Sequence, residues 1–234
     1  MKPMSKMWRR ARRSPFKLLR DRRGVAAIEF AMIVPIMLVL FFGTVEFSSA
    51  VAVDRKVTLI ARTLSDVTSQ SISVATTDLS NFFTAGCAIM YPYAGPPPCT
   101  QANNPMTAVI SELYVDPTTL KARVEWSVGY QGGVAQTVGV PPSGVTVPSA
   151  LLVSGTYLIL SQVGFTYKPA VAYGVMTNAG ITLNDVAYTR PRQSQCVWYP
   201  TPTSGPIPPC PGWCSKIRPT KKAKGRADGT AFLI

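Results

Sequence analysis

Glu29 is the residue whose chemical surroundings most need an explanation. It is the last charged residue before an uncharged run from position 30 to position 43. A carboxylate in a membrane-entering helix costs roughly 2.5–3.5 kcal/mol at the bilayer centre, and less near the interface. We therefore expect a positive charge to neutralise Glu29, and in the intact chain Arg22 and Arg23 could supply it.

Val25 offers a second source of positive charge. If the chain were cut after Gly24, Val25 would carry a free ammonium group. Val25 and Glu29 stand at positions i and i+4, on one face of a helix. The ammonium could therefore pair with Glu29 of its own chain or of a neighbouring copy.

Few other residues suggest reaction chemistry. The chain contains no histidine, which removes Ser-His-Asp and Cys-His catalysis. Glu112, Asp116 and Glu125 could form a catalytic carboxylate pair, but they fall in a predicted hairpin, where polar side chains usually form a solvated face. The glycines at positions 129–133 lack the lysine and the following helix of a phosphate-binding loop. The sequence therefore predicts no enzyme, no cofactor and no metal.

The five cysteines could form disulfides. Cys87 and Cys99 flank a proline-rich loop, and a bridge between them would contribute about 2–3 kcal/mol in the loop-entropy model. Cys196, Cys210 and Cys214 allow one bridge and one leftover thiol, through either Cys196–Cys210 or Cys196–Cys214. A zinc site is disfavoured because histidine is absent and the cysteine spacings do not fit one.

Glu29 lies within residues 25–47, and the length of this apolar segment predicts a membrane-spanning helix of about 34 Å. Ten Lys or Arg residues and one acid precede this helix. By the positive-inside rule the basic leader, residues 1–24, stays in the cytoplasm and the rest of the chain faces outward, where disulfides are allowed. Pro35 lies inside the helix and removes one backbone hydrogen bond, which predicts a kink.

Other interpretations of the N-terminus stay open. Ordinary signal anchors and cleaved signal peptides share the basic-then-apolar pattern, and Ala-Val-Ala at positions 50–52 offers a cleavage site. Two features argue against cleavage there. The apolar run is longer than that of a usual signal peptide, and the helical pattern continues beyond the site. Residues 1–20 could form a nucleic-acid-binding arm, but a cytoplasmic leader explains the same residues. Residues 24–215 carry eight basic and nine acidic residues, which argues against a nucleic-acid groove.

The exported part should have an α+β fold. Apolar residues recur at helical spacing from Val53 to Val67, which predicts an amphipathic stalk ending near positions 69–71. Thr77 and Asp78 could cap a short second helix. Strands are expected at 108–115, 120–128, 156–167 and 181–188, the first two as an antiparallel hairpin, with a Gly/Pro-rich linker at 129–148.

These elements predict four regions. The leader (1–24) and the transmembrane helix (25–47) are followed by an exported stalk and α+β domain (48–193), in which the stalk packs on a small antiparallel sheet. Residues 194–234 form a Pro/Cys-rich and basic tail that is largely irregular.

The basic leader, the glycine and the following Glu-Phe pair resemble the processing site of prepilins. The longer run RRGVAAIEFAMIVPIMLVLFFGTVEF resembles the TadE-like pseudopilins, or minor pilins, of the tight-adherence (Tad, or Flp) pilus system. Three later segments are also similar to motifs of that family: SELYVDPTTLKARVEWS, residues 147–169 and the Arg-Pro-Arg run at 190–192. The resemblance therefore covers roughly residues 20–192.

The resemblance implies cleavage between Gly24 and Val25 by a prepilin peptidase, and a charge-pairing and assembly role for Glu29 and Phe30. It also implies a bacterial inner-membrane protein with a periplasmic domain. Its partners would be the peptidase, other pilins and Tad pilus components, and inner-membrane lipid, with no nucleic acid. The alternatives are an unprocessed membrane-anchored periplasmic binding or structural domain, and a membrane-tethered enzyme.

Overall fold

The computed structural model describes residues 24–97, 99, 104–169, 180–202, 205–208 and 210 of the 234-residue chain. The chain divides into two compact units, Met1–Ser49 and Ala50–Ile234. The predictions on the basic leader at 1–23, on Cys214 and on the basic end of the tail lie outside the described residues.

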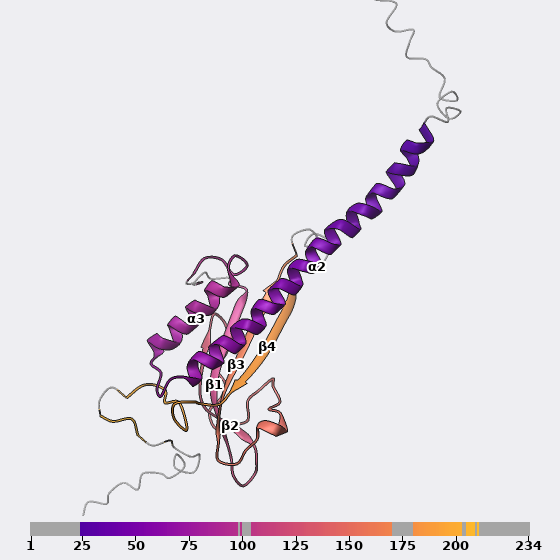
Figure 1. The fold of residues 1–234 in the computed structure, drawn as a ribbon. Helices are drawn as coiled ribbons and strands as arrows, with labels where there is room; N and C mark the ends of the chain where they lie inside the picture. The colour runs from indigo at the N-terminus through magenta and orange to yellow at the C-terminus, as the bar shows by residue number, and fades with distance from the viewer. Residues whose placement is uncertain are drawn as a thin grey trace, which may run out of the picture. The chain divides into compact units, whose positions relative to one another are not determined.

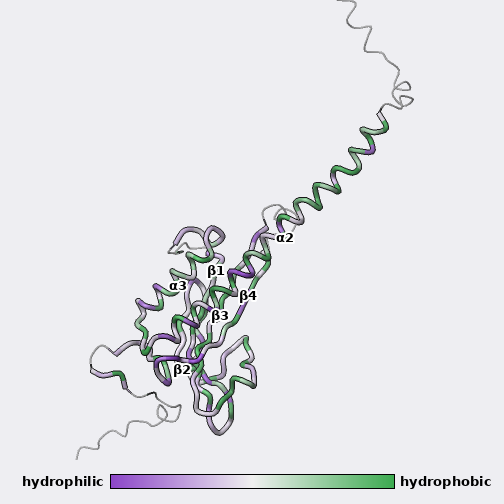
Figure 2. The backbone as a smooth tube through the Cα atoms, viewed as in Figure 1, coloured by the Kyte–Doolittle hydropathy of each residue, from purple (hydrophilic) through white to green (hydrophobic). Residues whose placement is uncertain are grey.

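Helix α2 (Val25–Ser69) begins in the first unit (Figure 1). Its side chains there are almost all exposed. Figure 2 shows that hydrophobic residues dominate this part of the helix. Within the described residues, α2 is the one helix long and apolar enough to cross a membrane. It is continuous through Pro35 and across positions 50–52, so the kink at Pro35 stays a prediction.

The second unit begins with the remainder of α2, which is amphipathic as predicted. Its buried apolar residues recur at helical spacing: Val53, Val57, Ile60, Ala61 and Leu64. The helix ends at Ser69, within the expected range.

A second helix, α3 (Thr76–Met90), has 15 residues and is longer than the short helix expected. Asp78 supports its beginning from inside the first turn, because its carboxylate accepts a hydrogen bond from the backbone N–H of Ala75 at 2.8 Å. Gly86 lets α3 approach α2 closely: a Cβ on this glycine would lie 3.1 Å from Ile60 Cγ2.

The described residues contain a four-stranded antiparallel sheet in the order β2-β1-β3-β4. Its strands are β1 (Met106–Val115), β2 (Ala122–Tyr130), β3 (Tyr157–Tyr167) and β4 (Ile181–Thr189). A short 3-10 helix, η4 (Ser149–Leu151), precedes β3. The predicted α+β fold, with its hairpin and its two later strands, is confirmed.

The hairpin differs from the prediction at its turn. Leu120 was expected to begin the second strand, but it is 49 % exposed and has a φ of 51°. Strand β2 begins two residues later, at Ala122, because Asp116 organises the intervening turn by accepting from the backbone N–H groups of Thr118 and Thr119 at 2.8 and 3.1 Å.

Both faces of the sheet are covered, which the sequence did not predict. One face packs against α2 and α3, through residues such as Ile60, Phe83 and Ile110. The opposite face forms a second core around Leu113, Val124, Leu158 and Leu160.

The prediction that residues 129–148 form a linker is therefore wrong. Its Val145 and Val147 pack against the second core. Its backbone also binds β2, through Val124 N–H to Val140 O at 3.0 Å and Gly139 N–H to Val124 O at 2.8 Å. Glycine and proline there shape a covering loop instead of a spacer.

The beginning of the predicted irregular tail also packs into the domain. It has no strand of its own, but Cys196 and Val197 are buried. The N–H of Trp198 donates to Ile72 O at 3.1 Å, and its carbonyl accepts from Val74 N–H at 2.8 Å. We refer to residues 193–200 as the strap, because they lie across the segment between α2 and α3.

Candidate functional site

The candidate processing and assembly residues lie at the exposed beginning of α2. A Cβ on Gly24 would meet no heavy atom within 4 Å. Phe30 is 70 % exposed, and Glu29 is exposed as well. These side chains are therefore open to lipid, to a peptidase or to another helix.

The helix geometry places Val25 and Glu29 about one turn apart, as the sequence required. Val25 is the first residue of α2, so an ammonium created there would stand at the helix N-terminus, where the helix dipole disfavours positive charge. A carboxylate one turn later offsets this effect. Whether the chain is cut there, and whether the pair forms, stay predictions.

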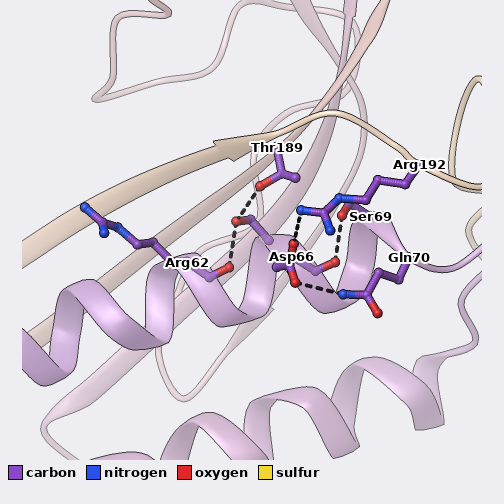
Figure 3. Close-up of polar contacts among 7 residues, drawn as sticks. Arg62, Asp66, Ser69, Gln70, Thr189 and Arg192 are labelled. Carbon is purple, nitrogen blue, oxygen red and sulfur yellow. Dashed lines mark hydrogen bonds and ion pairs between the residues drawn. The ribbon is translucent and has the colours of Figure 1, made fainter.

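A polar clamp closes the other end of α2, inside the second unit (Figure 3). The Arg192 guanidinium pairs with the Asp66 carboxylate, whose other oxygen accepts from Gln70 Nε2 at 2.7 Å. The backbone N–H of Arg192 donates to Ser69 O at 2.8 Å, and the hydroxyls of Ser65 and Thr189 are 2.9 Å apart.

This clamp gives the Arg-Pro-Arg run at 190–192 a structural role that the sequence did not reveal. It attaches the chain directly after β4 to the last turn of α2, where backbone carbonyls lack helical partners. The run itself was noticed, but nothing in the sequence indicated that Asp66 would be the partner of Arg192.

Glu112 and Glu125 are buried, each 3 % exposed, so the expectation that they line a solvated face is wrong. A bulge in the β1–β2 register between Glu112 and Leu113 shifts the alternation of β2. Glu112 Oε2 accepts from Trp126 Nε1 at 2.9 Å, and Oε1 accepts from the backbone N–H of Val197 at 2.6 Å. Trp126 Nε1 also donates to Val197 O at 2.7 Å.

The hydrogen bonds of Glu112 have a structural role. The cavity beside it has a volume of about 20 Å³, which is room for a water molecule and not for a substrate. The hydrogen bonds of Glu112 instead hold the strap against the sheet. Burial raises the pKa of the nearby Tyr157, and the charges of Glu125 and Glu112 raise it further.

Asp116, the third acid considered, does not join the pair. It lies in the turn between β1 and β2, and Arg123 is its ion-pair partner at 3.9 Å. The Thr118 hydroxyl and the backbone N–H groups of Thr118 and Thr119 lower the pKa of Asp116, with a smaller contribution from Arg123. Its contacts stabilise a turn.

Four of the five cysteines lie at disulfide distance within the described residues. Cys87 is joined to Cys99, with Cα atoms 6.1 Å apart, and Cys196 to Cys210, with Cα atoms 5.8 Å apart. Of the two pairings left open for Cys196, the structure contains the one with Cys210. One bridge ties the end of α3 to the proline-rich loop, and the other begins at the buried strap.

The described residues contain no cluster of three or more metal-ligating side chains. A long helix, whose exposed apolar first part is a candidate membrane anchor and whose remainder packs on an antiparallel sheet, defines an α+β protein. More particularly, residues 24–64 match the family described as TadE-like protein. The match begins at Gly24 and confirms the resemblance over this segment. Neither the curated proteins nor the solved structures gave a match.

Proposed function

We propose that this protein is a minor pilin, or pseudopilin, that serves assembly of a Tad (Flp) pilus at the bacterial inner membrane. The observation that carries the proposal is the TadE-like match at residues 24–64, which begins at Gly24 and covers the exposed apolar part of α2 and the buried stripe that follows it. The role is one of assembly and requires no catalytic site or cofactor.

In the proposed mechanism a prepilin peptidase removes the basic leader between Gly24 and Val25. The leader holds the N-terminus in the cytoplasm until then, and the domain after the anchor stands in the periplasm. The new ammonium of Val25 pairs with a Glu29 carboxylate, either in the same helix or in a neighbouring one. Pairing lowers the cost of placing Glu29 in lipid and thereby favours one register between adjacent helices.

The surrounding side chains support lateral association. Residues 30–43 carry no charge, and most of their side chains are exposed. Once the leader is gone, this surface can pack against the helices of other pilins or against lipid. The second unit then offers its surface to further pilus components.

The test is the N-terminus of the protein recovered from cells, measured by mass spectrometry. We expect it to begin at Val25, and we expect Gly24→Val to retain the leader. Gly43→Val is the matched control, because an added Cβ meets no atom within 4 Å at either glycine, and we expect it to be processed normally. A wild-type protein beginning at Met1, Val51 or Val53 would refute the proposal.

A further inference from the structure

The two outer strands of the sheet, β2 and β4, differ in the backbone hydrogen bonds that reach their outer edges. The edge of β2 is covered by the chain itself, through the bonds of Val124 to Gly139 and Val140. Among the described residues, no such backbone bond reaches β4 from its outer side. Alternate residues of an outer strand direct both N–H and C=O outward. The Val186 N–H already donates to the Asp185 carboxylate at 2.7 Å, and the other outward groups of β4 remain to pair with another extended chain.

A groove runs beside this open edge. Residues of α2 form one wall and the end of β4 forms the other, and the groove is open to solvent with a volume of about 360 Å³. The lining residues are Arg62, Thr63, Ser65, Asp66, Ala187, Tyr188 and Thr189. A helix flanking an open strand edge is the geometry in which peptides add to a sheet as an extra strand.

The flank of α2 is suited to contact the side chains of such a strand. Leu59, Arg62, Thr63 and Asp66 follow the i, i+3, i+4, i+7 spacing of a single helix face. Leu59 is 52 % exposed, although the stripe of α2 that faces the core is fully buried. An added strand could therefore cover an apolar side chain that the domain itself leaves in solvent.

Two charged residues line this groove, Arg62 and Asp66. Asp66 is paired with Arg192, whereas none of the ion pairs among the described residues involves Arg62. Figure 3 shows the Arg62 side chain extending away from the Asp66–Arg192 pair. An occupant that carries a carboxylate opposite Arg62 fits best.

We propose that the groove between α2 and β4 binds an extended segment of a partner polypeptide, with apolar and acidic residues, as a fifth strand of the sheet. The chain's own end is a poorer occupant, because residues 216–234 carry six basic residues and one acid and would be repelled by Arg62. This docking does not require removal of the leader, so its test can fail while the proposed function holds.

The test uses the full chain in lipid nanodiscs and a nine-residue capped peptide of alternating Thr and Val with a central Glu. A second peptide carries Lys in place of the Glu. In the free protein, alternate β4 amides should exchange rapidly with deuterium, and the Glu peptide should protect them. We expect the Glu peptide to bind up to about fivefold more tightly than the Lys peptide, as for an exposed ion pair. Arg62→Glu should reverse the preference, whereas Arg55→Glu, an exposed position on α2 outside the groove, should not.

A proline pair tests the backbone contribution. The Val186 N–H already donates to Asp185, so the pair is Ala187→Pro and Tyr188→Pro, two positions that line the groove. Inward and outward amides alternate along β4, so one of these variants removes an outward N–H while the other breaks a bond to β3. The variant that keeps its thermal stability should lose binding of both peptides. The proposal is overturned if neither peptide binds, if binding survives in that variant, or if the β4 edge is already protected by the chain's own residues or by a second copy.

Discussion

The Arg192 guanidinium pairs with the Asp66 carboxylate, 126 positions earlier in the chain. The backbone N–H of Arg192 donates to Ser69 O in the same turn of α2. Side chain and backbone thus act together, so that the segment leaving β4 holds the end of the helix.

Arg192→Ala should lower the free energy of unfolding of the domain only slightly. The paired side chains are 56 % and 40 % exposed, and exposed ion pairs contribute about 0.2–1 kcal/mol. The backbone bond to Ser69 remains in this variant. Denaturant unfolding of the full chain in nanodiscs measures the change, with the exposed Arg190→Ala as control. An equal loss of unfolding free energy in both variants would show that the Asp66–Arg192 ion pair does not stabilise the domain.

Glu112→Ala should be much more damaging, at about 2–3 kcal/mol or more. The substitution removes a buried carboxylate that accepts two hydrogen bonds. The buried Val197 N–H thereby loses its acceptor, which is costly. Glu112→Gln should cost less, because one acceptor oxygen remains. Unfolding followed by tryptophan fluorescence tests both variants, since Trp126 is one of the donors. A cost for Glu112→Ala below that of Glu112→Gln would contradict this account.

Asp116 should titrate below the ordinary range of an aspartate, because its pKa is lowered chiefly by the Thr118 hydroxyl. A carboxyl group whose pKa is depressed in the folded state contributes stability above its unfolded pKa of about 3.9, and this contribution is lost as the pH falls through the folded pKa. Thr118→Ala should therefore raise the pKa of Asp116, as measured by NMR titration. An unchanged value would exclude the hydroxyl as the main cause.

Glu29→Val should leave membrane insertion intact and impair assembly of the pilus. The substitution removes a charge that is costly in lipid, so insertion becomes easier, but the ammonium that the proposed cleavage creates at Val25 would lose its partner. Membrane fractionation and counts of surface pili provide the two readouts. Glu46→Val, a second acid of the same helix, is the control. Normal piliation in the Glu29 variant would count against charge pairing.

The helices and strands could be predicted because each follows a local pattern. The stripe from Val53 to Leu64 has helical spacing, and β3 is rich in β-branched and aromatic residues. The TadE-like segment was recognisable for a similar reason, since Gly24, Val25 and Glu29 lie close together in sequence.

What the sequence could not reveal depends on contacts between distant residues. Glu112 is buried because it lies on a sheet face that more distant parts of the chain cover, and Glu125 is the β2 residue left unpaired at the bulge. The loop over the second core and the strap are poor in regular secondary structure, so no periodicity marked them as packed. Asp66 and Arg192 meet only because the end of β4 reaches the end of α2.

The bond between Val197 and Glu112 also imposes an order on biogenesis. Glu112 belongs to the first strand of the sheet, whereas the amide that binds it emerges 85 positions later. A polypeptide threaded through a membrane with its N-terminus anchored would hold this acid without that donor until almost the whole domain had crossed. If the domain is exported in this way, the interior around Glu112 closes only after residue 197 has crossed, and a chain truncated before position 197 would lack the backbone donor that binds Glu112.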